Sequence, residues 1–200
     1  ATKVFLNGDP ELERRGIAVR VRYDRAAMFG VVLEARAGDL AEPCAVLVPP
    51  GSIVRAAPGY QDTAPIQARI LELKPRGRVE SPATICCAQI HSNDPRSAFP
   101  RGLATHDDPR LAKVAATAER DGDAWGPAQV AVWAVANNVT ASEVRGAPGS
   151  YGSYIDGARD LLERAGIDTN HLPLYSGAMP KARRSALGVD VLERLRAMGG

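Results

Sequence analysis

Short runs of alternating apolar and polar residues dominate residues 3–90. From Ile17 to Tyr23, apolar side chains alternate with Ala18 and two arginines, and this period of two predicts a half-buried antiparallel strand. Similar runs, bounded by Gly, Pro, Asp or Asn, lie at 28–35, 45–48, 53–56, 66–73 and 83–90. No helix-length segment lies between them to make parallel crossovers, so the runs predict an antiparallel β-sandwich.

The period changes to that of helices in the second half of the chain. Apolar residues recur at helical spacing from Leu111 to Ala118, and Asp108 followed by Pro109 predicts the start of this helix. A second helix, expected from Gly126 to Ala136, is apolar on nearly every side, which predicts burial. Further helices are expected at 155–165 and 181–198, with a loop at 146–154 and an irregular segment at 167–180.

These patterns define an α+β chain. Residues 1–92 are predicted to form the β-sandwich, 93–108 a connecting loop, and 109–200 a helical segment. The apolar helix around Trp133 must bury its surface, and the sandwich is the largest apolar partner in the chain. We therefore expect the helical segment to pack on the sandwich, so that both parts form one domain.

Composition narrows the class of protein. Hydrophobic residues make up 45% and charged residues 24% of the 200 positions, as in soluble globular proteins. A net charge of +2, spread over both halves, predicts no nucleic-acid partner, and no apolar run has the length of a membrane span. The chain starts at Ala1 without a leader. We expect an extracellular or periplasmic protein whose leader has been removed, or a chain that lacks its first residues.

The three cysteines are Cys44, Cys86 and Cys87. They lack the C-x-x-C spacing of zinc sites and thioredoxin-type redox pairs. One intrachain disulfide is possible, between Cys44 and either Cys86 or Cys87, because neighbouring cysteines rarely bridge each other without strain. The other reading is that the cysteines are buried thiols in the core.

Two segments within residues 85–133 carry a family resemblance. Ile85-Cys86-Cys87-Ala88 is followed downstream by Gln129-Val130-Ala131-Val132-Trp133. Together they resemble the thioester domains of Gram-positive surface adhesins. In that family the cysteine thiolate attacks the glutamine amide, expels ammonia and leaves an internal thioester that acylates an amine. The resemblance implies that Cys87, or alternatively Cys86, supplies the sulfur and Gln129 the acyl group.

The position of Gln129 also allows a plain structural role. It lies in the first turn of its predicted helix, at the positive end of the helix dipole, where a thiolate would be favoured. Alternatively, Gln129 belongs to a core helix and hydrogen-bonds a nearby backbone group.

Two further kinds of chemistry can be drawn from the residues. A cysteine hydrolase would use Cys86 or Cys87 as nucleophile, with a histidine and an aspartate chosen from His91, His106, Asp94, Asp107 and Asp108. A metal site could be drawn from the same histidines and aspartates. A turn after the strand and a solvated helix cap account for these residues more simply. We predict no metal site and no cofactor.

The best predicted binding surface is the loop Gly149-Ser150-Tyr151-Gly152-Ser153-Tyr154, because Tyr, Ser and Gly form adaptable contact surfaces. Tyr151 and Tyr154 of this loop, together with Trp125, are the candidate binding residues. The alternative is that the tyrosines cover the end of the sandwich. We expect a non-catalytic exported or cell-surface binding module for a protein or surface ligand. The alternative is a surface adhesin domain with an internal Cys-Gln thioester that reacts covalently with amines.

Overall fold

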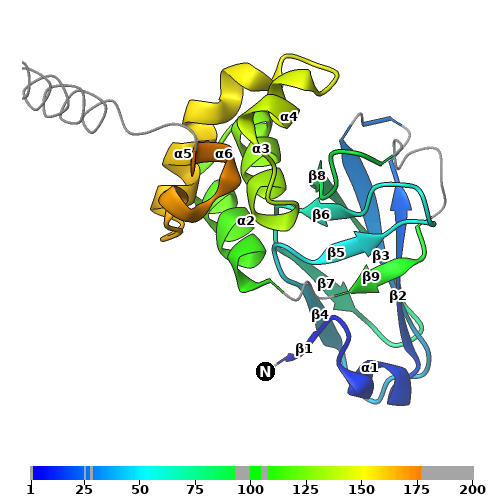
Figure 1. Ribbon diagram of the computed structural model, residues 1–200. Coiled ribbons are helices and arrows are strands. Elements are labelled where there is room, and N and C mark those ends of the chain that lie inside the picture. The colour runs from blue at the N-terminus through cyan, green and yellow to red at the C-terminus, as the bar shows by residue number, and fades with distance from the viewer. Residues whose placement is uncertain (1, 25, 28, 93–99, 105–107, 177–200) are drawn as a thin grey trace, which may run out of the picture.

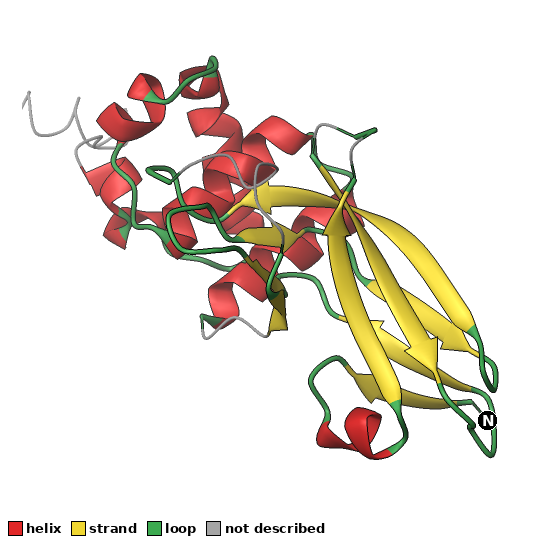
Figure 2. Ribbon diagram, turned by 90° about the vertical axis from the view of Figure 1, so that its right-hand side faces the viewer, coloured by secondary structure: helices red, strands yellow, loops and turns green. Residues whose placement is uncertain are grey.

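The computed structural model describes residues 2–24, 26–27, 29–92, 100–104 and 108–176. Strands dominate the first part of the chain and helices the second, which confirms the α+β class. The helices that follow residue 108 gather at one end of the strand-rich part, and a short helix at Pro10–Arg14 lies at the other end (Figure 1). Figure 2 shows the long strands of the sheet running away from the helices toward the opposite end of the molecule.

Six strands form one antiparallel sheet. They are β2 (Ile17–Tyr23), β3 (Gly30–Ala37), β5 (Ile53–Arg55), β6 (Thr63–Pro65), β8 (Arg78–Cys87) and β9 (Gly102–Ala104). The order across the sheet is β2-β3-β8-β6-β5-β9. The two outermost strands, β2 and β9, contact each other, so the sheet is nearly closed, like a barrel. A two-layer sandwich stays a prediction.

A second sheet holds β1 (Lys3–Leu6), β4 (Cys44–Val48) and β7 (Arg69–Leu73). β4 and β7 are antiparallel, whereas β1 pairs with β4 in parallel. The expectation of purely antiparallel strands was therefore wrong for β1. The parallel pairing is possible because β1 and β4 are separated by the β2–β3 hairpin and by α1 (Pro10–Arg14), which supply the long crossover that parallel strands require.

The helical part follows the predicted signals at its start. Asp108 caps α2 (Pro109–Asp121) by accepting from the Arg110 N–H, and Gly122 ends it with φ +67°. α3 (Trp125–Ala136) is buried over most of its length. After it come α4 (Ala141–Gly146), the 3₁₀ turn η2 (Tyr151–Tyr154), α5 (Ile155–Arg164), the 3₁₀ turn η3 (Thr169–His171) and α6 (Pro173–Ser176).

Several predicted boundaries differ from those observed. The run 66–73 was expected to be one strand, but residues 66–68 form a bend between β6 and β7, and only Arg69–Leu73 pair with β4. The predicted connecting loop contains β9, and the predicted loop at 146–154 contains η2. The helix predicted at 181–198 lies outside the described residues.

Buried apolar residues form two clusters. One lies between the three-stranded sheet and β2, β3 and β8, with Leu33, Val46 and Leu71 inside it. The other joins the helices to the strands around β6, with Cys86 and Ala64 packed among residues of α2, α3 and α5. The helix around Trp133 therefore shares a core with part of the strand region, as its apolar surface predicts.

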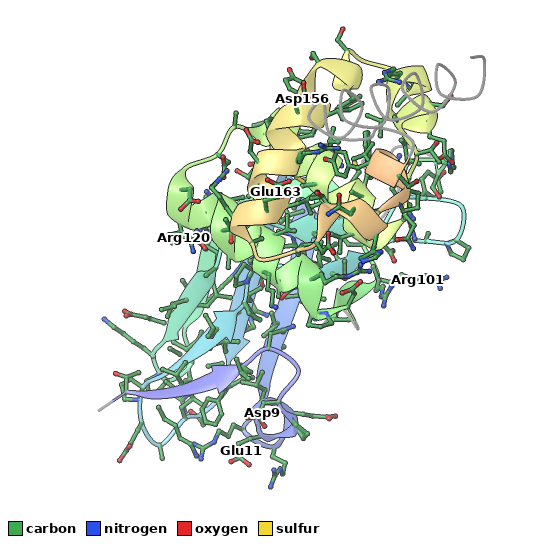
Figure 3. The ribbon with its side chains drawn as sticks, turned by 60° about the vertical axis from the view of Figure 1, so that its left-hand side comes forward. Asp9, Glu11, Arg101, Arg120, Asp156 and Glu163 are labelled. Atoms are coloured by element: carbon green, nitrogen blue, oxygen red, sulfur yellow. The ribbon has the colours of Figure 1, made fainter. Side chains whose placement is uncertain are left out.

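Charged side chains lie on the outside of both parts. Figure 3 shows Arg120, Asp156 and Glu163 on the helices, at the opposite end of the molecule from Asp9 and Glu11 near α1. Arg164 bridges Asp121 and Asp123 across the helical surface. Such exposed pairs contribute little to stability, so the buried clusters are the main source of stability.

The contact between Gly51 and α2 gives a stability prediction. A Cβ at Gly51 would lie 2.7 Å from Ala112 Cα, and Gly51 has φ +75°. We expect Gly51→Ala to lower the free energy of unfolding by about 2–4 kcal/mol, because backbone strain and overpacking add. Urea unfolding of the variant and of the unchanged chain measures this difference in the free energy of unfolding.

Gly59→Ala is the matched control. Gly59 has φ +85°, but no atom lies within 4 Å of the place that a Cβ would occupy, so only the backbone strain of about 1 kcal/mol applies. Equal losses in the two variants would show that α2 does not pack closely on the Gly51 turn.

Candidate functional site

The candidate site lies at the end of β8, where that strand no longer pairs with β3. The last residue pair between β3 and β8 is Gly30 with Thr84, and the Ile85 N–H still reaches Phe29 O. On its other edge β8 continues to pair with β6, through Cys86 opposite Ala64 and Cys87 opposite Thr63. The backbone of Ile85 and Cys87 on the β3 side therefore needs other partners.

Gln129 supplies the partners for Cys87. The Cys87 N–H donates to Gln129 Oε1 at 2.8 Å, and Gln129 Nε2 donates to Cys87 O at 2.8 Å. The glutamine side chain is fully buried. Its amide thus takes the place of a neighbouring strand, and it confirms the reading of Gln129 as a core residue bound to the backbone.

Trp125 supplies the partner for Ile85, one helical turn before Gln129. Its indole Nε1 donates to Ile85 O at 2.9 Å. The Trp125 ring stacks on Phe29, with ring centroids 3.7 Å apart. Trp125, predicted as a binding residue, is therefore held between a strand end and a neighbouring ring.

The sequence at the start of α3 allows this close approach. Ala124 gives no side-chain cap, and the Tyr154 ring lies where a Cβ on Gly126 would be, 2.6 Å from Tyr154 Cζ. Pro127 occupies an early helical position, where its missing N–H costs nothing. The absence of a side chain at Gly126 therefore allows Tyr154, in η2, to pack directly against the first turn of α3.

The two adjacent cysteines have different surroundings. Cys86 is completely buried in the helix-side cluster, and this burial raises the pKa of its thiol well above the ordinary value. Cys87 is only partly buried. Of the two, Cys87 is the residue whose backbone holds Gln129, so the structure brings together the cysteine and glutamine that the resemblance singled out.

Cys44 lies apart from this site. It packs in the cluster between the two sheets, whereas Cys86 packs in the helix-side cluster. No disulfide joins the three cysteines, all of which the structure describes. The pairing of Cys44 with Cys86 stays a prediction, but their separate clusters do not favour it.

Tyr151 and Tyr154 pack around the site. Tyr151 is half-buried and meets Trp133 edge-on, with ring centroids 4.8 Å apart. Burial raises the pKa of the Tyr151 hydroxyl, and the nearby Cys87 and Cys86 thiols add to this. Tyr154 keeps 39% of its surface exposed. Of the three predicted binding residues, Tyr154 is the most accessible.

His91 is engaged away from the cysteines. Its Nε2 lies 3.0 Å from Glu143 Oε1, and Glu143 is the capping-box residue of α4, bound to the N–H and hydroxyl of Thr140. Asp108 is the α2 cap. His106, Asp94 and Asp107, the other hydrolase and metal candidates, lie outside the described residues.

Two buried polar groups lie near the site: the hydroxyl of Thr63, which the sequence did not single out, and the indole N–H of Trp133, which it named only as part of an apolar motif. Thr63 Oγ1 and Trp133 Nε1 are buried and have no hydrogen-bond partner among the residues that the structure describes. Thr63 faces Cys87 across the β6–β8 pair, and Trp133 follows Gln129 by one helical turn. Thr63 and Cys87 are far apart in the chain, so only the strand register shows that they are neighbours.

No other feature competes with this site within the described ranges. A hollow at β5 and β9 is lined by Arg55, Tyr60, Asp62, Gln89 and Arg101 among others, and neither Cys87 nor Gln129 lines it. In the same ranges, no group of three or more His, Cys, Asp or Glu residues is placed to hold a metal ion, and no helix has the length and apolarity to cross a membrane.

Comparisons with protein-family models, curated proteins and solved structures found no match.

The Gln129 contact predicts a large effect on stability. Gln129→Leu removes both hydrogen bonds and leaves the Cys87 N–H and C=O without partners at the buried junction. We expect the free energy of unfolding to fall by about 2–4 kcal/mol, as measured by urea unfolding. Gln129→Glu, whose protonated carboxyl can make both bonds, should lose less at acid pH. A leucine variant as stable as the unchanged chain would contradict the role of the amide.

Glu143 predicts a pH effect. The Thr140 N–H, the Thr140 hydroxyl and His91 lower the pKa of Glu143 from its usual 4.5 to about 2. Folding therefore favours the carboxylate, and its contribution is complete above pH 4.5 and is lost as the pH falls toward about 2.

Glu143→Gln should remove this part of the pH dependence, as measured by urea midpoints across that range. Glu42→Gln, at an exposed position, is the control and should leave the dependence unchanged. If the Glu143→Gln and unchanged chains lose stability in parallel on acidification, the carboxylate does not stabilise α4.

Proposed function

We propose that this chain is an exported binding module that attaches to its partner covalently, through a thioester between Cys87 and Gln129. The observation that carries the proposal is the contact of the buried Gln129 amide with the backbone of Cys87, at 2.8 Å on both sides. These residues are 42 positions apart, and the resemblance to adhesin thioester domains named the same two.

The reaction is balanced without a cofactor. The Cys87 thiolate attacks Cδ of Gln129, the S–C bond forms, and the C–N bond to Nε2 breaks. The proton of the thiol leaves with the departing nitrogen as ammonia. A primary amine then attacks the thioester, forms an amide bond to Gln129 and returns the thiol to Cys87.

The hydrogen bonds at Gln129 suit this reaction. The Cys87 N–H already donates to Oε1, the atom that carries negative charge in the tetrahedral intermediate, so it acts as an oxyanion donor. The bond from Nε2 to Cys87 O is given up when ammonia leaves. Rotation of Cys87 about χ1 moves its sulfur among three staggered positions, and the reaction requires the one nearest the amide.

The surroundings favour Cys87 over Cys86 as the nucleophile. The thiolate is the reactive form, and burial disfavours it at Cys86 by raising the pKa of that thiol. Cys87 is only partly buried, so its side chain lies nearer the surface than that of Cys86. Gln129 is fully buried, which limits the access of water to the acyl carbon.

The partner in this proposal is a protein or surface ligand that carries a primary amine, met in an extracellular or periplasmic setting. The strand-rich half, predicted as a β-sandwich, serves as the scaffold that fixes β8. No nucleic-acid partner is proposed, because the net charge is only +2.

A non-covalent binding module is the second candidate. Exposed Tyr154, at 39%, favours it, since partly exposed tyrosines are common in contact surfaces. Trp125 and Tyr151, however, are occupied in contacts with Phe29, Ile85 and Trp133. The geometry therefore favours the covalent form.

Intact mass spectrometry under non-reducing, amine-free conditions tests the proposal. We expect the chain to be lighter than its calculated mass by one ammonia, and methylamine to add to Gln129 and restore one alkylatable thiol. Cys87→Ala and Gln129→Glu should both show their full calculated masses. Cys86→Ala is the matched control and should keep the loss of ammonia.

The opposite result is equally clear. A full calculated mass with three alkylatable thiols would contradict the thioester. Loss of ammonia that persists in Gln129→Glu would show that another side chain is the acyl donor.

A further inference from the structure

The hydroxyl of Thr63 is the buried polar group closest in register to the proposed nucleophile. Thr63 is completely buried, and its Oγ1 has no hydrogen-bond partner in the described part of the chain. A buried hydroxyl without a partner carries a desolvation cost. Its position opposite Cys87 on the neighbouring strand points to a partner that is present only in another state of the site.

The hydrogen-bond pattern fixes how Thr63 and Cys87 meet. Ile66 N donates to Thr84 O, and Ala88 N donates to Asp62 O, so the even-numbered residues of β8 bond to β6. Cys87 and Thr63 therefore form a non-hydrogen-bonded pair, the kind in which opposite side chains lie closest. Both side chains lie on the same face, just as their neighbours Cys86 and Ala64 share the helix-side cluster.

Cys87 thus lies between two side chains that serve different ends of the proposed reaction. On one edge of β8 is the Gln129 amide, and on the other is Thr63. Opposite Cβ atoms in such a pair are about 4.5–5.5 Å apart, so rotation about χ1 brings a threonine hydroxyl within hydrogen-bond reach of a cysteine sulfur.

We propose that Thr63 is a positioning residue that donates an O–H···S hydrogen bond to Cys87 when its sulfur is a thiolate. This inference rests on the proposed function, in which that thiolate attacks Gln129. The hydroxyl keeps the charged sulfur on the face of the sheet where both side chains lie. The thiolate strengthens this bond, because hydrogen bonds to a charged atom are stronger than those to a neutral one.

The test measures Cys87 directly, without requiring the thioester. In a chain with Cys44→Ala and Cys86→Ala, treated first with methylamine to open any thioester and then freed of the amine, Cys87 is the one thiol and residue 129 keeps an amide side chain. The rate of iodoacetamide alkylation against pH then gives the apparent pKa of Cys87. We expect Thr63→Val to raise this pKa by about one unit, and Thr63→Ser, which keeps the hydroxyl, to leave it nearly unchanged.

Thr63→Val has nearly the shape of threonine and removes only a hydroxyl that has no partner in the described residues, so we expect the folded state to be at least as stable. A second measurement uses the chain with Gln129, Cys44 and Cys86 unchanged. There, ammonia should be lost more slowly in Thr63→Val than in Thr63→Ser.

The outcomes separate this inference from the proposed function. An alkylation profile that is the same for threonine and valine overturns the role of Thr63, even where the intact mass shows the thioester. A profile that shifts in valine and returns in serine supports it, even where the intact mass shows no loss of ammonia. A serine variant that behaves like valine also overturns it, because the hydroxyl is then not the active group.

Discussion

The backbone of β8 needs hydrogen-bond partners on two edges, and beyond Thr84 one of those edges has lost its strand. The groups left open belong to Ile85 and Cys87, and α3 fills both positions with Trp125 and Gln129. Unpaired backbone groups at a buried junction are costly. The helical part is therefore attached to the sheet by a requirement of the strand itself, in addition to apolar packing, and the cysteine pair lies at that attachment.

The same arrangement gives Gln129 a structural role and makes it the acyl group of the proposed reaction, in which one of its two hydrogen bonds to Cys87 is given up. Its amide completes the hydrogen bonding of the sheet, and that contact also holds the acyl carbon beside a cysteine. Cys86 and Cys87 have opposite surroundings because adjacent residues of a strand face opposite sides. One thiol fills the helix-side core, and the other remains partly accessible. Under the proposed function, the structural and the chemical role therefore fall to two neighbouring residues.

Local patterns in the sequence predicted the elements better than their pairing. The alternation at Ile17–Tyr23 marked β2 at its observed bounds, and Asp108 with Pro109 marked the start of α2. The short elements β1, α1 and β9 have too few residues for a periodic signal. The contact of Cys87 with Gln129 was expected from a resemblance, whereas that of Cys87 with Thr63 depends on strand register, which tertiary packing sets.

The contacts of Trp125 and Gln129 with β8 depend on a match between the repeat of an α-helix and that of a strand. Four residues of α-helix rise about 6 Å, and two residues of strand span about 6.6 Å. α3 can therefore run beside β8 and meet every second residue with every fourth of its own, as it does at Ile85 and Cys87. Trp133 is the next residue in this series, but β8 ends at Cys87. The series thus stops where the strand stops, and the length of one strand decides which helical side chains are bound and which are left to other neighbours.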